Sequence, residues 1–103
     1  MDNLLNIDRL NKTQVEELMY LASSLKREFP NTNLDNSLKE KNVIFLFLEP
    51  STRTKTSFNF ACSILGVNII DISPMSSSIT KGETFENTIK TISSYPADAL
   101  VLR

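Results

Sequence analysis

Residues 42–58 decide the fold and read Asn42-Val43-Ile44-Phe45-Leu46-Phe47-Leu48-Glu49-Pro50-Ser51-Thr52-Arg53-Thr54-Lys55-Thr56-Ser57-Phe58. The part before Glu49 is almost entirely apolar and is rich in β-branched and aromatic side chains, which predicts a strand buried on both faces. After the motif, apolar side chains recur at the spacing of one helix face, at Phe58, Ala61, Cys62 and Leu65. A buried strand followed by a helix indicates an α/β fold.

Polar residues at the junction of this strand and helix predict an anion site. Ser51 and Thr52 are typical N-cap residues, and the first N–H groups of a helix have no acceptor within the helix. The positive end of the helix dipole, the guanidinium of Arg53 and the hydroxyl of Thr54 would lie beside them. Such a group of donors favours phosphate. The alternative is a well-capped helix with a surface arginine, and the pattern alone leaves both open.

The remaining signals predict the element order α-β-α-β-α-β. The expected elements are helix 12–28, strand 43–48, helix 53–65, strand 67–72, a helix from 84 to about 94, and strand 99–102. Asn11 and Gln14 would form a capping box, and Gly66 a left-handed C-cap. Short helices between strands make the sheet parallel. The predicted fold class is α/β, an open parallel sheet with flanking helices.

Residues 73–82 predict a long exposed loop. This segment has no hydrophobic period and contains several serines, a proline, a glycine and Lys81. A loop of this length in a small domain is often functional.

Composition and charge restrict the classes of function. The chain has 103 residues, a single cysteine, no histidine and a net charge of −1. This charge favours neither nucleic acid nor an anionic membrane as a partner, and no apolar run is long enough to span a bilayer. Without histidine, Ser-His and Cys-His catalysis are excluded within these residues, and a metal site is not expected. No nucleotide-binding loop occurs, so no cofactor is predicted.

The single cysteine indicates a reducing cellular compartment. Cys62 lies on the apolar face of a predicted helix, so we expect a buried thiol in a reducing environment. The N-terminal residues lack the basic and long apolar segments of a signal peptide. A cytoplasmic location is therefore the expectation.

Two motifs resemble those of a known family. Residues 49–54, Glu-Pro-Ser-Thr-Arg-Thr, followed by Ser57-Phe58, resemble the carbamoyl-phosphate motif of the aspartate/ornithine carbamoyltransferases. Residues 76–84, Ser-Ser-Ser-Ile-Thr-Lys-Gly-Glu-Thr, resemble the mobile loop of the aspartate branch. Residues 93–103 continue the match, so the resemblance covers nearly the whole chain. Pro50 and the serine-rich loop make the aspartate branch the closer match.

The resemblance implies a reaction and an assembly. The carbamoyl group of carbamoyl phosphate would be transferred to L-aspartate, giving N-carbamoyl-L-aspartate and phosphate in pyrimidine synthesis. The attacking amine belongs to the substrate, so no cofactor or metal is needed. A homotrimer with shared active sites, possible regulatory subunits and a cytoplasmic enzyme are implied. The alternatives are an ornithine or related carbamoyltransferase, or a non-catalytic anion-binding or interaction module.

The resemblance also implies a domain assignment. Residues 1–103 would form the N-terminal, incomplete part of a carbamoyl-phosphate-binding domain, with the aspartate-binding domain absent. A strand ending at the last residue, Arg103, agrees with that expectation. This chain alone would then be inactive.

Site residues follow from the same resemblance. Carbamoyl phosphate would be bound by Ser51, Thr52, Arg53, Thr54, Arg103 and Ser77, and L-aspartate by Lys81. Arg53, Thr54 and Arg103 would be catalytic, with Thr54 and Arg103 reaching the carbonyl oxygen where negative charge develops. By position alone, Arg103 is a charge at the end of a strand and Lys81 a solvated loop lysine.

Two further residues depend on the resemblance. Ser77 is chosen among three consecutive serines by counting back from Lys81, and the loop would enter the active site of a neighbouring subunit. Glu49 would pair with arginines of the other domain and would not be catalytic. Two residues depart from the family pattern. Asn59 stands where the family commonly has Glu, and Thr80 stands where a basic residue often precedes Lys81. These differences would change local packing or the charge of the loop.

The two arginines also predict the strand order. Arg53 follows the first strand and Arg103 the third, and both must reach one phosphate. The first and third strands should therefore be neighbours, with the second at the outside, in the order 2-1-3.

Overall fold

The computed structural model describes residues 3–28, 38–72 and 84–103, and the chain divides into two units, residues 1–34 and 35–103. The first unit holds a short 3-10 helix, η1 (Ile7–Arg9), and the helix α1 (Lys12–Glu28), whose bounds agree with the prediction. The predicted capping box is present. The Asn11 N–H donates to Gln14 Oε1 at 3.0 Å, and the Gln14 N–H donates to Asn11 Oδ1 at 2.8 Å.

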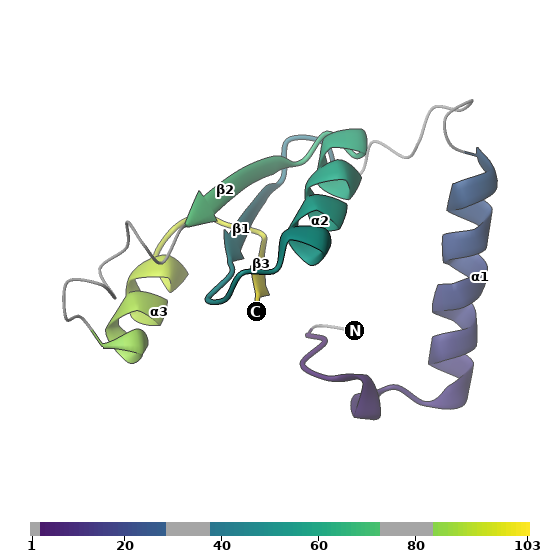
Figure 1. The fold of residues 1–103 in the computed structure, drawn as a ribbon, viewed down its shortest axis with the longest axis horizontal. Helices are drawn as coiled ribbons and strands as arrows, with labels where there is room; N and C mark the ends of the chain where they lie inside the picture. The colour runs from purple at the N-terminus through teal and green to yellow at the C-terminus, as the bar shows by residue number, and fades with distance from the viewer. Residues whose placement is uncertain (1–2, 29–37, 73–83) are drawn as a thin grey trace. The chain divides into compact units, whose positions relative to one another are not determined.

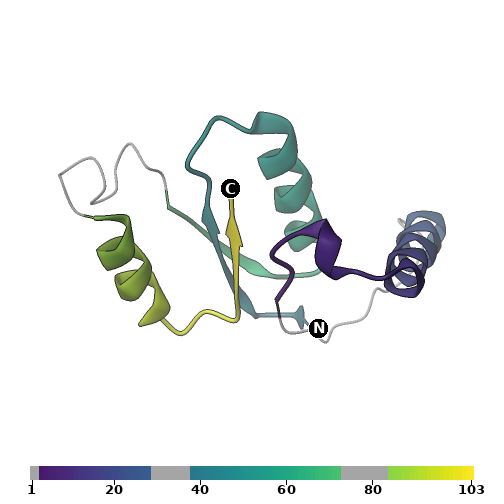
Figure 2. The same ribbon diagram turned by 90° about the horizontal axis from the view of Figure 1, so that it is seen from below.

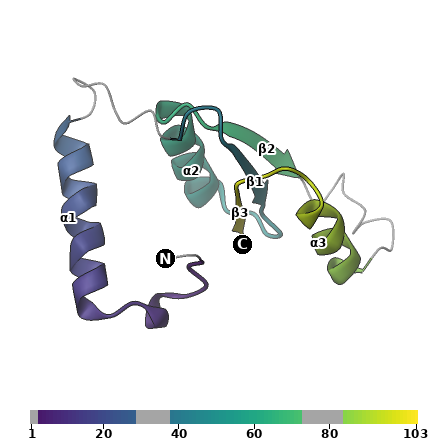
Figure 3. The same cartoon turned by 180° about the vertical axis from the view of Figure 1, so that it is seen from behind.

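The second unit is built on a three-stranded parallel sheet. Its strands are β1 (Asn42–Leu46), β2 (Asn68–Ile72) and β3 (Ala99–Leu102), and their spatial order is β2-β1-β3. Ile44 of β1 pairs with Ile70 of β2 and with Leu100 of β3. Figures 1 and 3 show β1 between its two neighbours from opposite sides. The predicted fold class and strand order are confirmed.

Two helices cover the two faces of this sheet. They are α2 (Thr52–Ile64) and α3 (Phe85–Ser93), and Figure 2 shows them on opposite sides of the strands. On one face Phe45 and Phe47 of the β1 segment pack with Cys62 of α2, and on the other Ile44 and Leu46 pack with Ile92 of α3. Because side chains alternate along a strand, β1 supplies both cores and is buried on both faces, as predicted.

The helix stripes predicted from spacing are only partly buried. Phe58 is 42% exposed and Phe85 is 44% exposed, although both lie at positions of the apolar stripe. In α2 the buried residue is Cys62, one turn further along, while the ring of Phe58 meets Phe45 edge-on at 6.2 Å. Phe85 is the first residue of α3, and the buried residues of that helix are Thr88 and Ile92. The spacing therefore predicted the helices correctly but overestimated the burial of the first aromatic residue in each apolar stripe.

A pair of left-handed residues lies at the amino ends of the strands. Gly66, the predicted C-cap of α2, has φ 73°, and Glu40 has φ 66°. The Glu40 N–H donates to the Gly66 carbonyl oxygen at 3.0 Å, which joins the two turns. The loop predicted at 73–82 lies outside the described residues. Within the described ranges, no helix is long and apolar enough to cross a membrane.

Candidate functional site

The start of α2 presents backbone donors that have no partner within residues 38–72 and 84–103. The first hydrogen bond into the helix runs from the Lys55 N–H to the Ser51 carbonyl oxygen at 2.9 Å. The N–H groups of Thr52, Arg53 and Thr54 therefore have no acceptor within the helix. The first turn contains no acidic residue, although acidic side chains are favourable at this end of a helix. This end of α2 keeps a positive electrostatic character and suits an anionic ligand.

Ser51 occupies the N-cap position, but its side chain does not cap the helix. Ser51 is thus an N-cap residue by position, as expected, but it makes no side-chain cap hydrogen bond. The Ser51 Oγ atom is buried and has no hydrogen-bond partner within the described part of the chain. Thr52 is the first residue of α2 rather than its cap. The hydroxyl of Ser51 thus has hydrogen-bonding capacity that the described part of the chain does not use.

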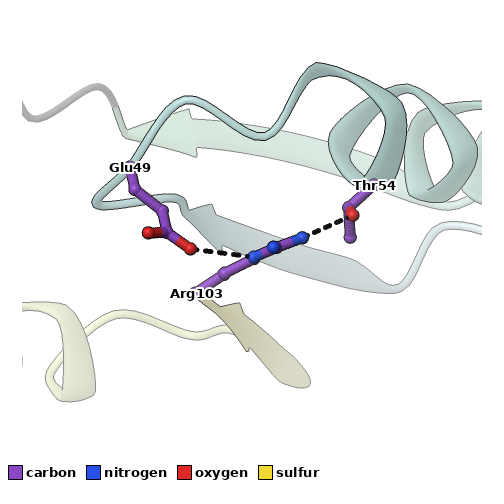
Figure 4. A network of polar contacts seen from close by, with 3 residues as sticks. All are labelled: Glu49, Thr54 and Arg103. Carbon is purple, nitrogen blue, oxygen red and sulfur yellow. Dashed lines mark hydrogen bonds and ion pairs between the residues drawn. The ribbon is translucent and has the colours of Figure 1, made fainter.

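Arg103 joins three separate segments at this site (Figure 4). Its Nε donates to Glu49 Oε1 at 3.0 Å, and its Nη1 donates to Thr54 Oγ1 at 2.6 Å. Glu49 follows β1, Thr54 lies in the first turn of α2, and Arg103 follows β3. The Arg103 and Glu49 side chains are 49% and 60% exposed, so the network is open to solvent.

Backbone hydrogen bonds hold Arg103 in place at the position from which its side chain extends. The Arg103 N–H donates to the Leu46 carbonyl oxygen at 3.0 Å, and its carbonyl oxygen accepts from the Leu48 N–H. Pairing between β1 and the β3 segment therefore extends to this last residue. Because β1 leads directly into the turn before α2, the guanidinium is placed beside the helix start by the sheet itself.

The structure brings together some predicted site residues and not others. Thr54 and Arg103 are in contact, and Ser51 and Thr52 belong to the same helix start. The side chain of Arg53 is exposed and makes no hydrogen bond or ion pair with the rest of the described chain. Ser77 and Lys81 lie outside the described residues. Their predicted roles remain predictions.

The contact between Glu49 and Arg103 was missed in the sequence. The prediction directed Glu49 toward a different domain, whereas here its carboxylate is bonded to Arg103. The signal lies in the strand order: β1 and β3 are neighbours, so charged residues just after each of them meet at one edge. Opposite charges at such positions favour an ion pair.

A second ion pair anchors the same helix end on the other edge strand. The Lys55 ammonium is paired with the Asp71 carboxylate of β2, with side chains 34% and 39% exposed. The Lys55 Nζ atom also lies 6.0 Å from the centre of the Phe47 ring, within the range of a cation–π contact. The sequence contains one signal for this pair: Asp71 is the acidic residue within the otherwise largely apolar strand β2, and such a carboxylate needs a cationic partner.

Cys62 has the properties of an inert core thiol. It lies on the buried face of α2, and burial raises the pKa of its thiol because the thiolate would be poorly solvated. A raised pKa lowers the thiolate fraction and hence the reactivity. Among the described residues, no group of three or more His, Cys, Asp or Glu side chains is placed to hold a metal ion.

Comparison with known proteins gives a consistent result. The family model described as "Aspartate/ornithine carbamoyltransferase, carbamoyl-P binding domain" matches residues 2–103. A catalytic subunit of aspartate carbamoyltransferase from Wolbachia sp. subsp. Drosophila simulans is 42% identical over 102 residues, which are 98% of this chain and 34% of that protein. The catalytic subunit from Staphylococcus saprophyticus is 41% identical over 104 residues, 100% of this chain and 33% of that one.

Solved structures agree with these relatives. Aspartate transcarbamoylase from Trypanosoma cruzi in complex with carbamoyl phosphate and aspartate matches with a TM-score of 0.83 and 35% identity, over 93% of this chain and 30% of that one. The catalytic subunit of the M. jannaschii enzyme matches with a TM-score of 0.84 and 34% identity, over 100% and 34% of the two chains. The chain thus spans about a third of the length of the curated relatives that it matches.

Proposed function

Because this chain belongs to the aspartate/ornithine carbamoyltransferase family, as part of its carbamoyl-phosphate-binding domain, we propose that the complete protein is an aspartate carbamoyltransferase. It would transfer the carbamoyl group of carbamoyl phosphate to L-aspartate, an early step of pyrimidine synthesis. The observation that carries this proposal is the contact of Thr54 with Arg103 at the start of α2. It joins two sequence-distant donors at the carboxyl edge of the sheet, where open parallel sheets bind ligands.

In this proposal the phosphate group binds at the helix start. The N–H groups of the first turn, the hydroxyls of Ser51 and Thr52 and the guanidinium of Arg53 supply the donors. The buried Ser51 Oγ supports this role, because it has no protein partner within the described chain. Arg53 also offers two parallel N–H groups to one phosphate, a geometry that lysine does not provide.

Thr54 and Arg103 would act on the carbamoyl carbonyl. The α-amine of aspartate attacks the carbonyl carbon and forms the new C–N bond, while negative charge develops on the carbonyl oxygen. Hydrogen bonds from fixed donors stabilise that oxygen more in the transition state than in the substrate. Collapse of the tetrahedral intermediate breaks the bond to the phosphate oxygen, and the departing phosphate takes up the proton that the amine loses. The donors are already held together by the Thr54–Arg103 bond.

The choice of amino acid and the assembly rest on the family. Relatives of both sequence and structure are named for aspartate, and one of the structures holds carbamoyl phosphate with aspartate. Lys81 would bind the aspartate, and Ser77 the carbamoyl phosphate, from the loop of a neighbouring subunit in a cytoplasmic homotrimer, with regulatory subunits as possible partners. The mass of the protein in solution checks the trimer.

The test is a carbamoyl-transfer assay on the complete protein. Product formation from carbamoyl phosphate is measured with L-aspartate and, separately, with L-ornithine. We expect activity with aspartate only. Activity with ornithine only would reassign the protein within its family. Binding of carbamoyl phosphate without any transfer would favour the non-catalytic module.

Matched variants assign the activity to the described site. Thr54→Val removes the hydroxyl bonded to Arg103 and should lower kcat/KM by roughly ten- to a hundredfold, the scale of one hydrogen bond to a charged group. Thr56→Val, two residues further along α2, removes a hydroxyl from an exposed residue and should leave kcat/KM within about twofold. Equal effects of the two variants would contradict the assigned role of Thr54.

A further inference from the structure

The ion pair of Lys55 with Asp71 is not used by the reaction described above. Lys55 nevertheless belongs to the first turn of α2, together with the predicted ligand-binding residues Thr52, Arg53 and Thr54. Asp71 pairs in register with Phe45 of β1, whose ring belongs to the core beneath α2. The carboxylate of Asp71 therefore belongs to the sheet face that α2 covers, and it receives the Lys55 ammonium there.

The start of α2 is consequently tied to both edge strands. Arg103, after β3, holds Thr54, and Asp71 of β2 holds Lys55. The ammonium of Lys55 also lies 6.0 Å from the centre of the ring of Phe47, the residue directly after β1. Adjacent residues of one helical turn thus meet the two opposite edges of the sheet, which restrains how this turn can tilt or slide.

Electrostatic attraction of an anion does not explain why Lys55 is paired with Asp71 at this helix start. Arg53 and Lys55 place two cations within the first four residues of α2, against the favourable direction of the helix dipole. Asp71 neutralises one of these cations, Lys55. Its negative charge also lies near the start of α2, where phosphate is expected to bind. A site that relied on electrostatic attraction only would bind anions better without this carboxylate.

We propose that Lys55 and Asp71 form a positioning ion pair for the anion site. The pair fixes the first turn of α2 so that the backbone donors, Arg53 and Thr54 converge with Arg103 on one ligand. This inference rests on the proposed function, since it requires that phosphate or carbamoyl phosphate binds at this helix start. Lys55 acts through the turn that it holds and not by touching the ligand.

The test measures binding of inorganic phosphate to the complete protein by calorimetry, with thermal unfolding of each variant. Asp71→Asn and Lys55→Met should each weaken phosphate binding by roughly two- to fivefold, the scale of a partly exposed ion pair. Lys55→Arg should keep phosphate affinity within about twofold of the wild type, because the arginine side chain can still reach the carboxylate of Asp71. Lys12→Met is the matched control, since it breaks the exposed pair of Lys12 with Glu16 at 3.8 Å in α1, and it should not change phosphate binding.

Asp71→Asn decides between positioning and charge. It removes a negative charge, so tighter phosphate binding would show that Asp71 acts only by repulsion and would overturn the proposal. Unchanged phosphate affinity with a lowered melting temperature would show a merely structural pair and would also overturn it. If Asp71→Asn does not fold, Lys55→Met decides instead, because it breaks the same pair from the helix side: weakened phosphate binding that Lys55→Arg does not share would support the proposal, and unchanged affinity would overturn it. Wild-type protein that binds neither phosphate nor carbamoyl phosphate would instead refute the proposed function itself.

Discussion

Glu49→Gln should strengthen the binding of phosphate at the start of α2. Glu49 Oε1 accepts a hydrogen bond from Arg103 Nε at 3.0 Å, so its carboxylate competes with any anion for the same guanidinium. The two side chains are 60% and 49% exposed, and ion pairs this exposed are worth about 0.2–1 kcal/mol. Removing the charge of Glu49 should therefore tighten phosphate binding by up to about fivefold, since 1.4 kcal/mol corresponds to a factor of about ten.

Calorimetric titration with inorganic phosphate at low ionic strength measures this change, because salt screens exposed charges beyond about 10 Å at 0.1 M. Glu86→Gln in α3 is the control, since it changes the net charge equally but is not bonded to Arg103. Its phosphate affinity should equal that of the wild type. Weaker binding in Glu49→Gln would refute the competition argument, because it would mean that Glu49 holds Arg103 in the geometry that binds phosphate.

Three further predictions concern stability, each measured by urea unfolding. Glu40→Gly should raise the free energy of unfolding by up to about 1 kcal/mol, because Glu40 has φ 66°, which glycine adopts without strain; a loss would show that the Glu40 side chain is itself stabilising. Thr88→Val should be neutral or stabilising by up to about 1 kcal/mol, since the buried Thr88 Oγ1 has no partner in the described chain; a clear destabilisation would reveal one. Burial raises the pKa of Cys62, so its contribution to stability is complete below the ordinary thiol pKa and is lost as the pH rises through the folded-state pKa. Cys62→Ala should abolish this alkaline loss, and an unchanged pH dependence would contradict the assignment.

The order and bounds of the elements could be predicted because local signals agreed with one another. The capping box of Asn11 and Gln14 and the left-handed Gly66 are chemical marks of helix ends, and both are present in the structure. The strand order followed from a functional constraint, that Arg53 and Arg103 serve one ligand. The amount of burial could not be predicted, because spacing gives the face of a helix but not how much of it the sheet covers. Phe58 and Phe85 are the examples.

The candidate site could be predicted by residue type but not by partner. Arg103 and Thr54 were both expected to act on the ligand, and the structure adds that they are bonded to each other. The partners of Glu49 and Lys55 are residues remote in the sequence, Arg103 and Asp71, and depend on the register of neighbouring strands. Local patterns contain no information on such pairs until the sheet order is known.

The charge pattern at the start of α2 limits how this protein can be made more heat-stable. Adding Asp or Glu to the first turn of a helix is a common way to gain about 0.3–1 kcal/mol, and this turn has no acidic residue. At this helix, however, the added carboxylate would occupy the place where an anion is expected to bind. Thermostability gained there should be lost again as ligand affinity, a trade-off seen where activity depends on a locally destabilised site. Stabilising substitutions are therefore better placed at the amino ends of the strands, away from this turn.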